Sequence, residues 1–242
     1  MTFGIEAWRG RRVAFIGDSI TEGVGSDRAY HEYLSQWLGI EAYNYGVNGA
    51  QTDYMLQLAK RLEAEHPDVD AVFLFGGTND FNHGLPMGEF YTAEPGAVNH
   101  NGQTVQRLHR ALVFDEGTFC GRLNRLLGEL KRGFPRAQVI VMTPIHRGFA
   151  RFSNENVQPD ELWANAQGLF IGDYAEAVRR AARIWSAPLI DLYRDCGLLP
   201  AFGEYAPFFH LADTDNLHPN ARGHERSAET IAAALNAIPA RV

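Results

Sequence analysis

Short apolar segments alternate with segments of helical periodicity along this chain, and this alternation restricts the fold more than any other sequence feature. Between the short apolar segments, apolar residues recur at helical spacing, as Met55, Leu58 and Leu62 do. Strands that alternate with amphipathic helices are typical of βαβ units, which build a parallel sheet. Five segments are predicted strands: residues 12–16, 41–45, 71–75, 138–142 and 189–192.

Five strands joined by right-handed crossovers predict an α/β fold, a flavodoxin-like three-layer α/β/α sandwich with a five-stranded parallel sheet. We expect the strand order 2-1-3-4-5, which makes the first and third strands neighbours. Ligands of such sheets bind just beyond the carboxyl ends of the strands, where the strand order reverses. No linker rich in Pro, Gly or Ser divides the chain, so residues 1–242 are interpreted as a single domain.

Two long stretches, residues 78–115 and 143–168, show little periodicity and are predicted to be irregular loops. Loops of this length in a compact domain are usually functional. We therefore expect residues 81–117 and 145–168 to roof a ligand pocket.

The charge balance excludes some classes of partner. A net charge of −7 argues against a nucleic-acid binder and against an electrostatic membrane anchor. The two cysteines, Cys120 and Cys196, form no CxxC motif and are expected to be free thiols. The N-terminus lacks the apolar run of a signal peptide, and no apolar stretch approaches the ~18 residues of a membrane span. A cytoplasmic location is expected, unless a leader has been trimmed.

Two segments far apart in the sequence carry the groups of a nucleophilic enzyme. Ser19 follows the first predicted strand, where a hydroxyl can face a ligand, but a serine needs an adjacent base to attack. Asp215 precedes His218 by three residues and can orient the imidazole so that its Nε2 accepts the serine proton. Pro219 disfavours a helix at His218, so we expect this histidine on a rigid turn.

Donors for an oxyanion follow the second and third predicted strands. A glycine in the segment Asn44 to Ala50, either Gly46 or Gly49, offers a backbone amide. Asn79, in the segment Gly76 to Asp80, offers a side-chain amide. With the amide of Ser19, these groups would form a three-donor oxyanion hole.

Together the segments resemble the SGNH (GDSL) hydrolase family, which is named for Ser, Gly, Asn and His in four separate blocks. Gly17-Asp18-Ser19-Ile20 resembles the first block, with Ile where the family name has Leu. Gly49, Asn79 and the Asp215–His218 pair match the other three blocks, in the same chain order. The resemblance implies hydrolysis of esters or thioesters without a metal or cofactor. It implies a triad of Ser19, His218 and Asp215 and an oxyanion hole of Ser19, Gly49 and Asn79.

The substrate is inferred less directly. No contiguous apolar stretch in the two long loops offers a trough for a long acyl chain. We therefore expect a short acyl group, such as acetyl, on a polar alcohol such as a carbohydrate; a lysophospholipase or thioesterase is the enzymatic alternative. The candidate substrate contacts are Asp18, Phe81, His83, His146 and His210.

Two other hypotheses use the same residues differently. His210, Asp213, Asp215 and His218 could together bind a divalent metal, although no ligand signature such as HExxH supports this. A non-catalytic flavodoxin-like module that binds a nucleotide or sugar would keep the glycines, but it does not need the Asp215–His218 pair. The sequence makes no prediction of oligomeric state.

Overall fold

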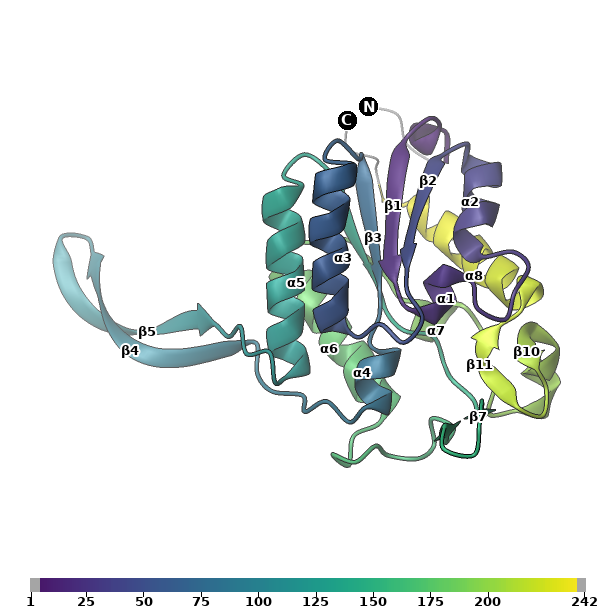
Figure 1. Ribbon diagram of the computed structural model, residues 1–242. Helices are drawn as coiled ribbons and strands as arrows, with labels where there is room; N and C mark the ends of the chain where they lie inside the picture. The colour runs from purple at the N-terminus through teal and green to yellow at the C-terminus, as the bar shows by residue number, and fades with distance from the viewer. Residues whose placement is uncertain (1–4, 239–242) are drawn as a thin grey trace.

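The computed structural model describes residues 5–238, which form a twisted parallel sheet between two layers of helices (Figure 1). The predicted α/β fold and strand order are confirmed: all four strand pairings are parallel. The last strand is shorter than predicted, because Asp191 caps the following helix instead of continuing the strand. In spatial order the strands are β2 (Glu41–Gly46), β1 (Arg12–Gly17), β3 (Ala71–Phe75), β6 (Gln138–Met142) and β9 (Leu189–Ile190).

Side chains alternate along each strand, so the sheet contributes to a separate core on each face. Ala14 and Ile16 of β1 pack under α3 (Thr52–Glu65), α5 (Phe119–Gly133) and α6 (Ile171–Ile184). Val13 and Phe15 pack under α2 (Tyr30–Leu38) and α8 (Ala221–Leu235) on the opposite face. Burial on both faces explains why the central strands are apolar throughout. The remaining helices are short: η1 (Ile5–Trp8), α1 (Ser19–Glu22), α4 (Thr78–Asn82), α7 (Leu192–Asp195) and η2 (Gly203–Phe208).

The prediction of an irregular loop over residues 78–115 is wrong. After α4, the chain forms a long antiparallel hairpin of β4 (Tyr91–His100) and β5 (Gln103–Leu112), which we call the arm. Asn101 and Gly102 both have positive φ at its tip, as an Asn-Gly hairpin turn requires. The arm projects away from the sheet (Figure 1) and does not roof the ligand pocket as predicted.

A second, smaller sheet lies beyond the carboxyl ends of the main strands. It joins β10 (Phe209–Leu211), β11 (Asp215–Pro219), β7 (Ala150–Arg151) and β8 (Val157–Gln158), with all pairings antiparallel. His218 therefore lies on a strand and not on the predicted turn. Asn220 then caps α8 by accepting hydrogen bonds from the amides of Arg222 and Gly223.

Over residues 5–238, no helix combines the length and the apolar character needed to cross a membrane.

Candidate active site

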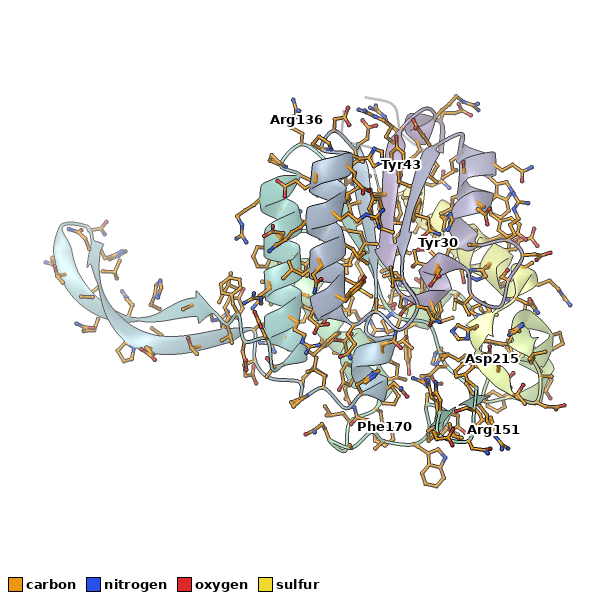
Figure 2. All side chains as sticks on the ribbon, in the orientation of Figure 1. Tyr30, Tyr43, Arg136, Arg151, Phe170 and Asp215 are labelled. Atoms are coloured by element: carbon orange, nitrogen blue, oxygen red, sulfur yellow. The ribbon has the colours of Figure 1, made fainter. Side chains whose placement is uncertain are left out.

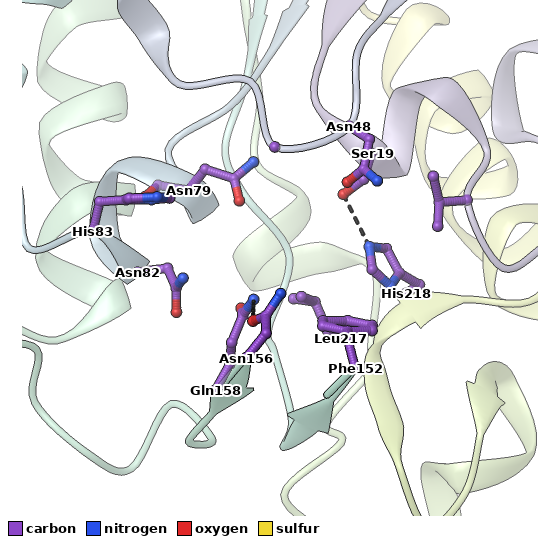
Figure 3. A pocket seen from close by; sticks show the side chains of 12 residues that line it. Ser19, Asn48, Asn79, Asn82, His83, Phe152, Asn156, Gln158, Leu217 and His218 are labelled. Atoms are coloured by element: carbon purple, nitrogen blue, oxygen red, sulfur yellow. Dashed lines mark hydrogen bonds between the residues drawn. The ribbon is translucent and has the colours of Figure 1, made fainter. Parts of the chain in front are cut away.

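The structure brings Ser19, His218 and Asp215 into one hydrogen-bonded chain, although 199 positions separate the serine from the histidine. Ser19 Oγ lies 2.9 Å from His218 Nε2 (Figure 3), and His218 Nδ1 lies 2.9 Å from Asp215 Oδ2. An ionised carboxylate can only accept hydrogen bonds, so Nδ1 carries the proton and donates to Asp215. Nε2 is then free to accept the proton of the serine hydroxyl.

A tight turn between β1 and α1 positions Ser19. A side chain at Gly17 would collide with Thr21, because its Cβ would lie 2.0 Å from Thr21 Oγ1. Asp18 caps α1 by accepting a hydrogen bond of 3.0 Å from the amide of Ile20. Ser19 is therefore the first residue of α1, just beyond the carboxyl end of a central strand.

Asp18 is fully buried and does not line the pocket, so the structure gives no support to the predicted contact between Asp18 and substrate. Burial raises the pKa of this carboxyl to about 7, against the hydrogen bond from Ile20 and the charge of His218. Its second oxygen, Oδ2, has no partner among the described residues. Asp18 therefore shapes the turn that presents Ser19, although burial destabilises its charged form.

Asp215 remains ionised despite its burial. Burial alone would raise its pKa, but hydrogen bonds and charge from His218, together with a hydrogen bond from His210, hold the pKa below its ordinary value. Its Oδ1 also accepts hydrogen bonds from the amides of Leu217 and His218, at 3.2 and 3.1 Å. These contacts fix the carboxylate on β11 and orient the imidazole toward Ser19.

The two other predicted oxyanion donors line the same pocket as Ser19. Asn79, on α4, donates one amide hydrogen to the carbonyl of Ala50 at 3.0 Å, which fixes its side chain and leaves a second N–H. Gly49 lies in the β2–α3 loop with a φ of +77°. The amide of Gly46 is not available to an oxyanion, because it already donates to Asn44 Oδ1. The Cα of Gly46 packs against the backbone of Glu22. The pocket wall therefore includes Gly49 and not Gly46.

The pocket has a volume of about 470 Å³ and a wall rich in amide side chains. Of the predicted substrate contacts, only His83 lines it, with Nδ1 2.9 Å from the carbonyl of Asn79. Phe152 closes one side, its ring centroid 5.4 Å from that of His218. The sequence reasoning missed Asn48, Asn82, Phe152, Asn156 and Gln158 (Figure 3).

Three other predicted contacts do not line this pocket. Phe81 is buried in the core against Tyr174. His146 stacks on Tyr193 and has its Nδ1 2.6 Å from Glu161 Oε1. His210 instead contacts Asp215, with its Nδ1 3.0 Å from Oδ2. Residues 145–168 do supply part of the wall, whereas residues 81–117 contribute only Asn82 and His83.

The alternative metal site is not assembled. Both His210 and His218 direct Nδ1 at the same carboxylate, and Asp213 is exposed. In the part of the chain that the structure describes, no three His, Cys, Asp or Glu side chains are arranged to hold a metal ion.

A parallel α/β sheet with a Ser–His–Asp chain at its carboxyl edge defines the class of serine hydrolases with a flavodoxin-like fold. The GDSL-like lipase/acylhydrolase family model matches residues 15–226, and the chain belongs to this family. No curated relative matches the chain significantly.

Several solved structures have the same fold. A protein from Lactobacillus plantarum is 26% identical, with a TM-score of 0.72 over 95% of this chain and 98% of its own. A possible lipase from Chitinophaga pinensis is 20% identical, with a TM-score of 0.72 over 94% and 98% of the two chains. A lipase/acylhydrolase from Enterococcus faecalis is 18% identical, with a TM-score of 0.58 over 96% and 98%.

Proposed function

We propose that this hydrolase cleaves short-chain acyl esters of neutral, polar alcohols, with Ser19 as the nucleophile. The observation that carries the proposal is the hydrogen-bonded chain from Ser19 Oγ through His218 to Asp215. A serine hydroxyl becomes an effective nucleophile when a base can take its proton as the new bond forms. His218 is within hydrogen-bond reach of Ser19, and Asp215 stabilises the imidazolium that results.

The reaction proceeds in two steps. Ser19 Oγ attacks the ester carbonyl while its proton passes to His218 Nε2. The amides of Ser19 and Gly49 and the side chain of Asn79 stabilise the oxyanion of the tetrahedral intermediate. His218 then protonates the leaving alcohol, and an acyl group remains on Ser19. A water molecule, deprotonated by His218, repeats the attack and releases the acid.

The pocket wall supports the choice of substrate. Amide side chains can donate and accept hydrogen bonds at the same time, which suits the hydroxyl groups of a sugar. None of the described residues that line the pocket is Lys, Arg, Asp or Glu, so the wall favours a neutral alcohol over a charged headgroup. Val24, Leu217 and Phe152 are its apolar members, and they offer room for a small acyl group near His218.

Hydrolysis of p-nitrophenyl acetate by the wild type and by Ser19→Ala tests the nucleophile. We expect Ser19→Ala to lower kcat by about 10⁴-fold or more. The matched control is Ser227→Ala, which removes an equally buried serine on α8 and should keep wild-type activity. A chelator such as EDTA should change neither rate. Retained activity in Ser19→Ala would contradict the proposal, and loss of activity with EDTA would favour the metal hypothesis.

A series of p-nitrophenyl esters from acetate to palmitate tests the acyl group. We expect kcat/KM to be highest for acetate and to fall as the chain lengthens, because the wall offers few apolar contacts. A maximum at long chains would instead support the lysophospholipase or thioesterase alternative.

A further inference from the structure

The arm, β4 and β5, takes no part in the proposed function, because none of its residues lines the pocket. β4 and β5 pair over ten positions, from Tyr91 opposite Leu112 to His100 opposite Gln103. Figure 2 shows the side chains of the arm clear of those of the body along most of its length. A two-stranded hairpin is only marginally stable in water unless it packs against something else. Among residues 5–238 of a single chain, the arm has no such support beyond its base.

The two faces of the arm differ in character. Side chains alternate between faces, and the register places cross-strand partners on the same face. One face, which we call the apolar face, carries Ala93, Pro95, Ala97 and Leu108, with Tyr91 and Leu112 at its base. Its polar members are Asn99, Thr104, Gln106 and Arg110. The opposite face carries Glu94, Arg107 and both histidines of the arm, and its large apolar members are Val98 and Val105. The apolar face is therefore the richer of the two in apolar side chains, as the buried face of a sheet is when its other face lies in water.

The apolar face is nevertheless exposed in the single chain. Leu108 is 74% exposed, and Ala93, Pro95 and Ala97 are exposed as well. Removing a leucine side chain from water stabilises the state that buries it. The pattern therefore indicates that a partner covers this face.

Charge favours a second copy of this chain as the partner. Residues 91–112 contain Arg107, Arg110 and Glu94, which gives the arm a net charge of +1. The whole chain carries −7, so the rest of it carries −8. Another arm would repel this one, whereas the body of another copy attracts it.

The area of one face of the arm indicates that, in a dimer, the arm of each copy would contact the body of the other. An arm of ten residue pairs is about 33 Å long and about 10 Å wide, so one face covers roughly 330 Å². One arm packed on another would bury only about 660 Å² in total, which is below the ~1,200–2,000 Å² of stable interfaces. Two arms, each on the body of the other copy, would bury about 1,300 Å², within that range.

We propose that the chain forms a two-fold symmetric dimer by exchanging arms. The apolar face of each arm packs on the body of the other copy. The interface is isologous, so each contact occurs twice. The arm is thus a dimerisation element, independent of the chemistry at Ser19.

Sedimentation velocity of the full chain at about 1–100 μM tests this proposal. We expect a mass of about twice the 27.0 kDa of one chain, and we expect Leu108→Asp to shift the protein to monomer. Leu162→Asp is the matched control, because Leu162 is 71% exposed but lies outside the arm. It should leave the dimer intact. A monomeric wild type at all concentrations, or an assembly that Leu108→Asp leaves unchanged, would overturn the proposal.

Hydrogen exchange of the wild type gives a second readout that needs no variant. Amides of residues 91–112 should exchange more slowly at 100 μM than at 1 μM, because the partner body protects them. Rapid exchange that does not depend on concentration would overturn the proposal even if Leu108→Asp failed to fold.

Discussion

Two imidazoles share one carboxylate in this site. Asp215 Oδ2 lies 2.9 Å from His218 Nδ1 and 3.0 Å from His210 Nδ1. His218 is buried and reaches Ser19, whereas the His210 side chain is 41% exposed and does not line the pocket. His210 can therefore affect the reaction only through Asp215, as a positioning residue.

Replacing His210 with Ala should lower kcat/KM by less than about 10-fold near pH 8, because the contact is partly exposed to solvent and has the strength of one ordinary hydrogen bond. The loss should deepen as pH falls. Without His210, Asp215 loses one of the contacts that hold its pKa down, so the carboxylate is protonated at a higher pH than in the wild type. The measurement is kcat/KM for p-nitrophenyl acetate between pH 4 and pH 8. His100→Ala, at the exposed tip of the arm, is the control; identical profiles for the two variants would contradict this role.

For single residues, the sequence was sufficient to predict that Ser19, His218 and Asp215 come together. Ser19 was identified by its place at the end of a predicted strand, and the Asp215–His218 pair by its three-residue spacing. Asn156 and Gln158 could not be predicted, because Gln158 lies on β8, a strand of two residues that is too short for periodicity, and Asn156 directly precedes it. The available signal was the presence of amide side chains at every second position, Asn154, Asn156 and Gln158. His210 was singled out, but as a substrate contact, because spacing alone does not show which side of Asp215 it occupies.

Two glycines at the connection between β2 and α3 have different constraints: Gly46 is the last residue of β2, and Gly49 lies in the loop that follows. A Cβ at Gly46 would lie 2.1 Å from the backbone nitrogen of Glu22, which cannot move away without displacing α1. A Cβ at Gly49 would have no neighbour within 4 Å, and its only penalty is the positive φ.

Gly49→Ala should therefore cost about 1–2 kcal/mol of unfolding free energy, the price of a left-handed conformation, and retain its amide donor. Gly46→Ala should cost more, by several kcal/mol, because it forces overpacking against backbone. Urea denaturation of both variants measures the difference. The prediction fails if Gly46→Ala is as stable as Gly49→Ala.

The elements that the sequence predicted poorly are those whose partners are not local. The central strands and long helices were predicted because burial on both faces of the sheet leaves a strong apolar pattern. The arm was missed although Asn101-Gly102 is a hairpin signal. Val98, Val105 and Arg110 each stand on the face opposite to the one that a strict period-two pattern would give them, so the alternation that predicts a strand is interrupted. β11 was missed because it pairs with segments of two or three residues.

At the scale of the whole molecule, the turn that presents Ser19 makes stability depend on pH. Asp18 has a pKa of about 7 in the folded state because burial disfavours its charge, against an ordinary value of 3.8. A carboxyl with a raised pKa stabilises the fold fully below its unfolded pKa. That stabilisation is lost as pH rises toward the folded pKa.

The unfolding free energy of the wild type should therefore fall, relative to that of the Asp18→Asn variant, as pH rises from about 4 to about 7. The relative loss should approach about 4 kcal/mol, from the linkage of about 1.4 kcal/mol per pKa unit. Asn keeps an oxygen that can accept from the amide of Ile20, so the cap should survive. Urea denaturation of both proteins across this pH range is the test, and parallel stability curves would contradict the assignment.

The central claim is that His218 activates Ser19 for attack on an acyl carbon, and covalent trapping tests it most directly. After incubation with a serine-reactive phosphonate, intact-mass spectrometry should find one adduct per chain, and peptide mapping should place it on Ser19. His218→Ala should react far more slowly. Modification of another residue, or equally fast labelling of His218→Ala, would contradict the account.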